Sequence, residues 1–196
     1  GSMPSFSRDG SRLAMSESAQ TVVLMGSMDD TSLPSSDGLV YVYDAGTGKL
    51  VGPPISPDRR LSPYAPFIDL GADGKGLLMA LAGTLALVDP DTGAAQRAPI
   101  RYDTENKSRD AMERAVFSPD GRTLLSHTAG RVRLYDRHSG APVGKVMRHE
   151  GEVTASMFTP DGSQIVTAGA DGTIRRWQAR GVGRDAPGTP TGAVLR

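Results

Sequence analysis

Three side chains near the end of the sequence have the types that a hydrolytic triad requires. His149, Thr167 and Asp171 supply an imidazole, a hydroxyl and a carboxylate, the groups that nucleophilic catalysis combines. No oxyanion-hole motif accompanies them, and the indole N–H of nearby Trp177 is a donor that needs a buried acceptor. The residue types therefore favour a structural hydrogen-bond network, and we expect no catalytic residue and no enzyme activity.

Metal and cofactor sites also find little support. The chain has three histidines and no cysteine, so a metal site would depend on carboxylates, and His127 and His138 stand apart from other ligand types. Most aspartates lie in turn-like segments, where a carboxylate bonds the local backbone. The glycines follow turns and do not mark a strand-to-helix phosphate loop. We expect no metal and no cofactor.

Overall charge and hydrophobicity exclude several other classes of partner. Lys plus Arg and Asp plus Glu both number 22, so nothing favours a phosphate backbone or an anionic membrane. Two basic pairs, Arg131 with Arg133 and Arg175 with Arg176, lack the aromatic series of a nucleic-acid track and are interpreted as exposed strand positions. No apolar run approaches the ~20 residues of a spanning helix, and the N-terminus lacks the features of a targeting signal. The absence of cysteine fits a reducing, cytoplasmic compartment.

The candidate network lies in a segment, 149–178, that predicts three short strands. The runs 153–158, 163–168 and 173–177 are separated by the turn signals Thr159-Pro160-Asp161-Gly162 and Asp171-Gly172. Proline presets φ early in a turn and glycine accepts positive φ. The segment is therefore predicted to be an antiparallel meander.

Earlier parts of the chain repeat this pattern. The third strand of each copy ends at Asp44, Asp89, Asp136 or Gln178, at separations of 45, 47 and 42 residues. After the first three, a Thr-Gly or Ser-Gly pair leads into a short run that would form a fourth strand. The fourth-strand runs are 50–55, 95–100 and 142–147. Four strands in each ~40- to 45-residue repeat are typical of propeller blades.

The repeats resemble those of the WD40 β-propeller family. Its FSPDG turn is intact at 117–121, appears as FTPDG at 158–162 and is degraded to LGADG at 70–74. The resemblance covers about residues 11–178 and implies an all-β propeller of four blades. It also implies that His149, Thr167, Asp171 and Trp177 form the family's structural tetrad, although Gln178 replaces the usual Asp and the other copies lack the His.

We expect the following domain organisation. Residues 1–3 are typical of a cloning scar, 4–178 hold the four blades, and 179–196 form a Gly/Pro-rich tail that is flexible or supplies an edge strand. The expected blades span about 11–55, 63–100, 113–147 and 150–178. In blade 1 we prefer a register in which Leu13–Ser27 forms strand, turn and strand, and not the alternative in which Phe6–Gly10 is the first turn.

Long connections gather at one end of the predicted blades. Connections from strand two to three and from strand four to the next blade share an end, and 28–37, 56–65 and 101–112 all fall there. Loops on a rigid scaffold often carry binding, although these could also be tolerated insertions. The candidate protein-binding residues are Asp29, Asp30, Leu33, Arg59, Arg60, Tyr64, Tyr102, Glu105 and Arg109.

The expected function is a non-catalytic interaction module or scaffold that binds a protein or peptide through this loop end. By resemblance, it would be the sensor or regulatory end of a larger bacterial signalling or defence protein. The alternatives are a propeller hydrolase or lyase with a central-channel site, or a structural self-assembly unit. Four blades would form half of an eight-bladed ring in a homodimer, a small four-bladed ring, or part of a longer protein.

Overall fold

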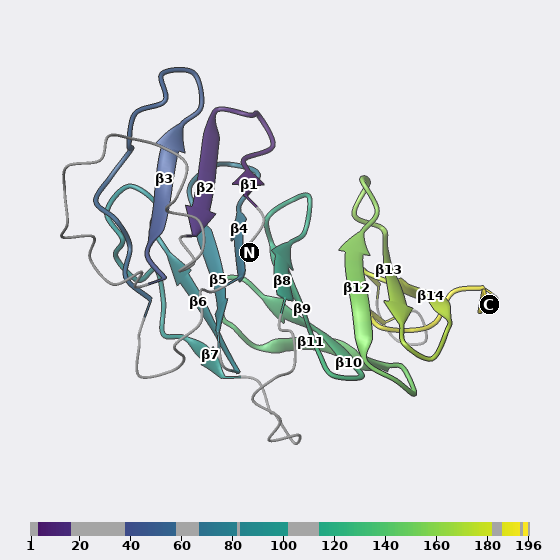
Figure 1. Cartoon of the computed structure of the whole chain (residues 1–196). Helices are drawn as coiled ribbons and strands as arrows, with labels where there is room; N and C mark the ends of the chain where they lie inside the picture. The colour runs from purple at the N-terminus through teal and green to yellow at the C-terminus, as the bar shows by residue number, and fades with distance from the viewer. Residues whose placement is uncertain are drawn as a thin grey trace. The chain divides into compact units, whose positions relative to one another are not determined.

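The computed structural model describes seven segments of the chain. These are residues 4–16, 38–57, 67–81, 83–101, 114–181, 186–192 and 194–195. Every regular element in them is a β-strand, and the strands form four antiparallel sheets in which consecutive strands pair (Figure 1). The chain divides into two units, Gly1–Arg101 and Tyr102–Arg196, with two sheets in each. Within the described segments, no helix has the length and hydrophobicity needed to cross a membrane.

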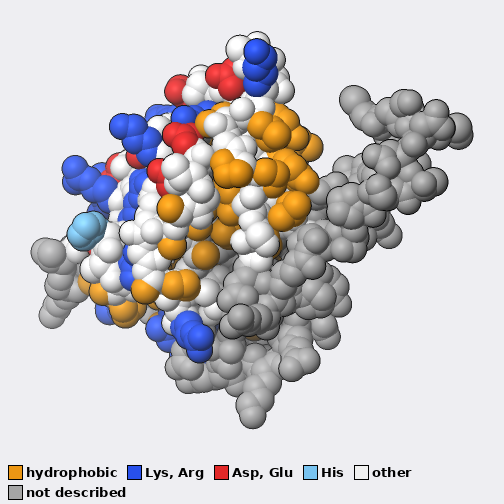
Figure 2. Space-filling model, turned by 90° about the vertical axis from the view of Figure 1, so that its left-hand side faces the viewer, with side chains coloured by type: hydrophobic (Ala, Val, Ile, Leu, Met, Phe, Trp, Pro, Cys, Tyr) orange, Lys and Arg blue, Asp and Glu red, His pale blue; other side chains and the backbone are white. Residues whose placement is uncertain are grey.

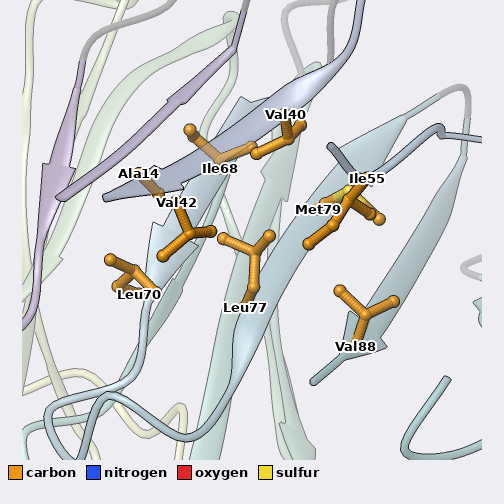
Figure 3. Close-up of a cluster of buried hydrophobic side chains, with 9 residues drawn as sticks. All are labelled: Ala14, Val40, Val42, Ile55, Ile68, Leu70, Leu77, Met79 and Val88. Atoms are coloured by element: carbon orange, nitrogen blue, oxygen red, sulfur yellow. The ribbon is translucent and has the colours of Figure 1, made fainter. Parts of the chain in front are cut away.

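The first unit contains blades 1 and 2. Blade 1 consists of β1 (Ser5–Phe6), β2 (Arg12–Ser16) and β3 (Val40–Asp44). Blade 2 consists of β4 (Phe67–Leu70), β5 (Leu77–Leu81), β6 (Thr84–Val88) and β7 (Ile100–Arg101). Alternate residues of one sheet point to opposite faces, so Ala14, Val40 and Val42 share a face. They pack with Leu77 and Met79 of blade 2 in the core of this unit (Figure 3).

The second unit contains blades 3 and 4. Blade 3 consists of β8 (Arg114–Phe117), β9 (Thr123–Thr128), β10 (Arg131–Asp136) and β11 (Pro142–Arg148). Blade 4 consists of β12 (Val153–Phe158), β13 (Gln164–Gly169) and β14 (Ile174–Gln178). Leu125 and Val132 of blade 3 pack with Val153, Ile165 and Trp177 of blade 4.

A hydroxyl and a carboxylate close the turn between the first two strands of three blades. In blade 3, Ser118 Oγ donates to Asp120 Oδ1 at 2.6 Å and accepts the N–H of Thr123 at 2.9 Å. Thr159 with Asp161 in blade 4 and Ser7 with Asp9 in blade 1 make the same contacts. The following glycine has a φ near 70° in all three. The sequence pattern therefore encodes a specific bonded turn.

This bonding corrects the predicted register of blade 1. Ser7–Gly10 forms the first turn, so β1 pairs with β2 through Ser5↔Ala14 and β2 pairs with β3 through Ala14↔Val42. The preferred interpretation, which took Leu13–Ser27 as strand, turn and strand, was wrong. It was preferred because it left 41–55 as an uninterrupted third strand, turn and fourth strand, and it gave no weight to the Ser7–Asp9 pair that bonds the first turn. Blade 1 consequently begins before residue 11.

Aspartate closes the turn between the third and fourth strands of blades 1 to 3. Asp136 Oδ1 accepts the N–H and the hydroxyl of Ser139, both at 2.7 Å. Asp44 bonds Thr47 and Asp89 bonds Thr92 in the same way. Gln178 has no carboxylate, and blade 4 obtains its fourth strand differently.

The fourth strands differ in regularity. β11 pairs along β10, whereas blade 1 has single bridges at Leu50 and Ile55, and blade 2 has Ala95 together with β7. In blade 4 the described part of the tail runs along β14, with bridges at Ile174↔Leu195 and Trp177↔Pro190. These described tail residues thus lie at the edge of the blade 4 sheet, where a fourth strand would be expected.

Candidate functional site

The nine candidate binding residues on the long connections lie outside the described residues. They are Asp29, Asp30, Leu33, Arg59, Arg60, Tyr64, Tyr102, Glu105 and Arg109. Their place in the sequence still follows from the described strands, because 17–37 connects β2 to β3, 58–66 precedes β4 and 102–113 precedes β8. Their role in binding stays a prediction.

Four side chains of blade 4 form a continuous chain of hydrogen bonds. They lie at the end of the blade that corresponds to the long connections of blades 1 to 3. Trp177 Nε1 on β14 donates to Thr167 Oγ1 on β13 at 2.9 Å. Thr167 Oγ1 lies 2.7 Å from His149 Nε2, and His149 Nδ1 lies 3.1 Å from both carboxylate oxygens of Asp171. The loop that leads into β12 thus supplies the imidazole, and the turn after β13 supplies the carboxylate.

For a neutral imidazole the contacts select one arrangement of protons. A carboxylate only accepts, so the proton on Nδ1 of His149 is donated to Asp171 and Nε2 accepts the hydroxyl proton of Thr167. The oxygen of Thr167 then accepts the indole proton of Trp177. Each polar atom of the chain has a partner under this arrangement, which is the condition for a buried network to stiffen its surroundings.

Asp171 is held by its own turn as well as by His149. Its carboxylate accepts the hydroxyl of Thr173 at 2.7 Å, the N–H of Thr173 at 3.0 Å and the N–H of Glu150 at 3.1 Å. These donors, the Thr173 hydroxyl first, hold the pKa of Asp171 far below its usual range. The carboxylate therefore stays charged and keeps accepting from the imidazole.

Gly169 is required by this geometry, although it is absent from the residues predicted above. A Cβ at this position would overlap Nδ1 of His149 and would lie 2.7 Å from Oδ1 of Asp171. Only a residue without a side chain leaves room for the imidazole to approach the carboxylate. In the sequence, Gly169 is the first glycine of Gly169-Ala170-Asp171-Gly172. It could not be distinguished there from a glycine that only forms a turn.

The burial and the hydrogen bonds of Thr167 argue against a hydrolytic triad. Thr167 is 1% exposed, and its oxygen accepts the indole N–H of Trp177 while its proton goes to His149. A nucleophile must reach its substrate with a free lone pair. The buried and doubly bonded hydroxyl suits a structural network.

The four arginines interpreted as exposed strand positions occupy different environments. Arg176 is exposed, but Arg131, Arg133 and Arg175 are half-buried. Arg175 donates to the carbonyl of Arg148 at 3.0 Å and to Asp171 at 3.2 Å. For Arg175 the prediction was wrong, because its guanidinium braces the Asp171 turn against the end of β11.

A second buried histidine links the blades of the second unit. His127 on β9 is 1% exposed, and its Nδ1 lies 2.6 Å from Ser156 Oγ on β12. Burial, and then the positive charge of Arg114, lowers the pKa of His127 to about 4. Nothing in the sequence pattern indicated this pair, whose members are 29 residues apart. Throughout the described residues, no three His, Asp or Glu side chains gather into a group that could hold a metal ion.

Comparison with known proteins relates these blades to one family. The WD domain, G-beta repeat family (WD40) matches residues 140–178. An uncharacterized WD repeat-containing protein of Synechocystis sp. is 32% identical over 109 residues, which are 54% of this chain and 30% of the relative. Pre-mRNA-processing factor 19 homolog 2 of Arabidopsis thaliana is 36% identical over 102 residues, covering 52% of this chain and 18% of the relative.

A solved structure has the same fold. The β-propeller domain of Cps50 (Swd1) from Myceliophteria thermophila superposes with a TM-score of 0.63 at 17% sequence identity. The match covers 89% of this chain and 50% of that chain. The chain thus corresponds to half of this propeller, and to less than a third of the length of either relative above.

Proposed function

We propose, on the premise that the chain carries WD40 repeats folded as β-propeller blades, that it is a non-catalytic module that binds a protein or peptide. WD-repeat relatives are typically protein-interaction scaffolds. The binding surface in this proposal is the loop end of blades 1 to 3. The chain spans 30% and 18% of the length of two such relatives. In this proposal it is part of a larger protein, acts there as a sensor or regulatory module, and works in the cytoplasm.

The observation that carries the proposal is the contrast between the two ends of each blade. At one end the turns are short and closed by their own side chains, as in Ser118–Asp120 and Asp136–Ser139. At the other end blades 1 to 3 carry the long connections 17–39, 56–66 and 102–113. Variable loops on a rigid scaffold are a common way to build a recognition surface.

The hydrogen-bond network of blade 4 lies at the same end as the long connections of blades 1 to 3, and in our proposal it makes that end of blade 4 rigid. Its loops are short, and Gly130 O of blade 3 accepts the N–H of His149 at 2.9 Å, next to the bonded imidazole. A buried, satisfied network holds such loops in one conformation. In our proposal blade 4 is the anchor, and the loops of blades 1 to 3 make the contacts.

The proposal is tested by comparative capture from the source lysate. One variant changes Arg59, Tyr64 and Tyr102 to alanine, because Tyr and Arg dominate interaction hot spots. The matched control changes Arg8, Lys49 and Arg122 to alanine, three exposed residues in the short turns at the opposite end of their blades. We expect a partner that the control retains and the loop variant loses. Equal recovery of every partner by both variants would refute binding through the loop end.

A further inference from the structure

The fourth strand of blade 4 is attached to its sheet in a different way from the other three. In blades 1 to 3, the turn before the fourth strand is closed by Asp44, Asp89 or Asp136, which accepts the backbone N–H three residues further on. Gln178 stands at this place in blade 4, and its carbonyl accepts the N–H of Gly188 at 2.7 Å. Residues 186–192 and 194–195, the tail strand, are thus held by backbone bonds to β14 and β11, and not by a turn of the Asp type (Figure 1).

The tail strand is bonded to β14 along its backbone. Besides the Gly188 bond, the contacts are Gln178 N–H to the Thr189 carbonyl at 2.8 Å, Thr191 N–H to the Arg176 carbonyl at 2.8 Å, and the bonds that Ile174 and Leu195 exchange at 2.9 and 3.1 Å. Val194 is 48% exposed and Leu195 is 57% exposed. Apolar exposure alone does not mark this place, because Figure 2 shows hydrophobic side chains gathered on the side of β3 as well. The backbone bonds mark it, and such bonds select an extended conformation more than a sequence.

One point of β11 gives the contact its sequence requirement. The carbonyl of Pro187 accepts the N–H of Lys145 at 2.8 Å, and both Pro187 and Gly188 are buried. A Cβ on Gly188 would overlap the carbonyl oxygen of Lys145, and a Cβ on Gly144 would overlap the carbonyl oxygen of Pro187. The two backbones therefore approach each other only because each has a glycine here. An extended segment fits this place when a glycine follows the carbonyl that bonds Lys145.

We propose that the edge of β14, together with Gly144 and Lys145 of β11, is a binding site for an extended segment of a partner polypeptide. The tail strand occupies this site in cis and is displaced when the partner binds. In such recognition the backbone hydrogen bonds at a sheet edge supply the affinity. The partner segment carries glycine at the position of Gly188 and needs no particular side chain where Val194 and Leu195 lie exposed. None of these residues belongs to the long connections, so the inference does not depend on binding through the loop end.

The balance of hydrogen bonds favours a different polypeptide over a second copy of this chain as the occupant. The tail strand of a second copy already makes these bonds to its own β14, so an exchange between copies breaks as many bonds as it forms. A partner with an unpaired extended segment breaks none. Its affinity is then set by competition with the tail strand, because the site is accessible only in the fraction of molecules whose tail strand is detached.

Fluorescence anisotropy with a labelled peptide tests this competition. The probe has the sequence of residues 186–195, APGTPTGAVL, and the protein is the whole chain. Gly188→Ala in the protein detaches the tail strand and leaves β14 and β11 unchanged, so this variant should bind the peptide at least about tenfold more tightly than the wild type does. The same peptide carrying Gly188→Ala is the matched control and should not bind, because its Cβ would collide with Lys145.

Two further variants test whether the peptide uses this site. The chain has no cysteine, so Arg176→Cys with Thr191→Cys introduces one disulfide across the edge, where the Thr191 N–H donates to the Arg176 carbonyl. The oxidised form holds the tail strand in place and should not bind the peptide, and reduction should restore binding. Gly144→Ala, added to Gly188→Ala, places a Cβ where the carbonyl of the peptide's proline must lie and should abolish binding. Circular dichroism checks that each variant keeps its β-sheet signal.

The wild-type chain provides a test that no substitution can disturb. Whenever the tail strand detaches, the peptide covers the N–H groups of Ile174 and Gln178, so an excess of peptide should slow their amide exchange. The peptide carrying Gly188→Ala should leave that exchange unchanged. Exchange that the matching peptide does not slow, or equal peptide binding by the oxidised and reduced forms of the cysteine variant, would overturn the binding site and make the tail strand a fixed part of blade 4.

Discussion

The four side chains of the blade 4 network, Trp177, Thr167, His149 and Asp171, are joined to one another by hydrogen bonds. Trp177 donates to Thr167, Thr167 donates to His149, and His149 donates to Asp171. Asp171 stays charged because Thr173 and Glu150 also donate to its carboxylate. Removing any one member leaves a buried group without its partner, which costs more than the bond itself contributed. We therefore expect the stability of the chain to fall when a single polar group of the network is removed.

Trp177 offers the clearest test of this sensitivity. Trp177→Ala should lower the free energy of unfolding by about 3 to 5 kcal/mol, because it removes a buried aromatic side chain and leaves a cavity. Trp177→Phe keeps most of the packing and removes the indole donor, so we expect a smaller loss of about 1 to 3 kcal/mol. Denaturant unfolding measures both values. An unchanged stability in Trp177→Ala would contradict a structural role for the network.

The buried His127 predicts a dependence of stability on pH. Its pKa is lowered to about 4 in the folded chain, against about 6.5 when unfolded. Between these values the unfolded chain binds a proton that the folded chain does not, so stability falls as pH decreases from about 6.5 to about 4. The full loss is about 3 kcal/mol, reached when the folded chain also takes up the proton.

Urea unfolding of wild type and His127→Gln over this pH range measures the effect. The difference in stability between the two proteins should shrink or change sign as pH falls, because the variant lacks the titrating group. Arg122→Gln, in an exposed turn of the same blade, is the control for a substitution that leaves His127 in place, and it should keep the wild-type slope. Parallel pH profiles of wild type and His127→Gln would show that His127 does not cause the dependence.

At the scale of elements, the turns carry most of what the sequence could predict. The pairs Ser118–Asp120 and Asp136–Ser139 are local, so their bonds follow from residues a few positions apart. These turn signals predicted the strand order and the four sheets, whereas the candidate network was implied by the resemblance to WD40 repeats. In blade 1 an uninterrupted segment at 41–55 was given more weight than the Ser7–Asp9 pair, and the register was therefore predicted wrongly.

What the sequence could not predict depends on contacts between distant segments. The tail lacks the alternation of a strand because its bonds to β14 come from scattered residues, including Thr189, Thr191 and Leu195. The pair His127–Ser156 forms because two sheets pack together, and no periodicity encodes that approach. Gly169 matters because of an imidazole that enters from another loop.

The tail makes a prediction at this scale. Gly188 lies so close to β11 that a Cβ would overlap the carbonyl oxygen of Lys145, and its φ is +81°. Gly188→Ala should therefore detach this part of the tail and increase amide exchange at Ile174 and Gln178, which bond to it. Gly192→Ala is the matched control, because its φ is +78° but its Cβ would approach only the Arg176 side chain, at 3.3 Å.

Both substitutions carry the cost of a left-handed backbone, about 1 kcal/mol. Only Gly188→Ala adds a collision with the backbone of β11, so the difference in stability between the two variants isolates that contact. Equal destabilisation and equal exchange in both would show that the tail does not depend on its approach to β11.

At the scale of the whole molecule, the expected homodimer predicts a link between stability and association. An eight-bladed ring made by two copies would couple folding to dimerisation, so the melting temperature of the wild-type chain should rise with protein concentration. Scanning calorimetry over a dilution series measures this dependence, and light scattering over the same series measures the mass against the 20.6 kDa of one chain. A melting temperature that does not change with concentration, together with the mass of one chain at every dilution, would contradict the homodimer.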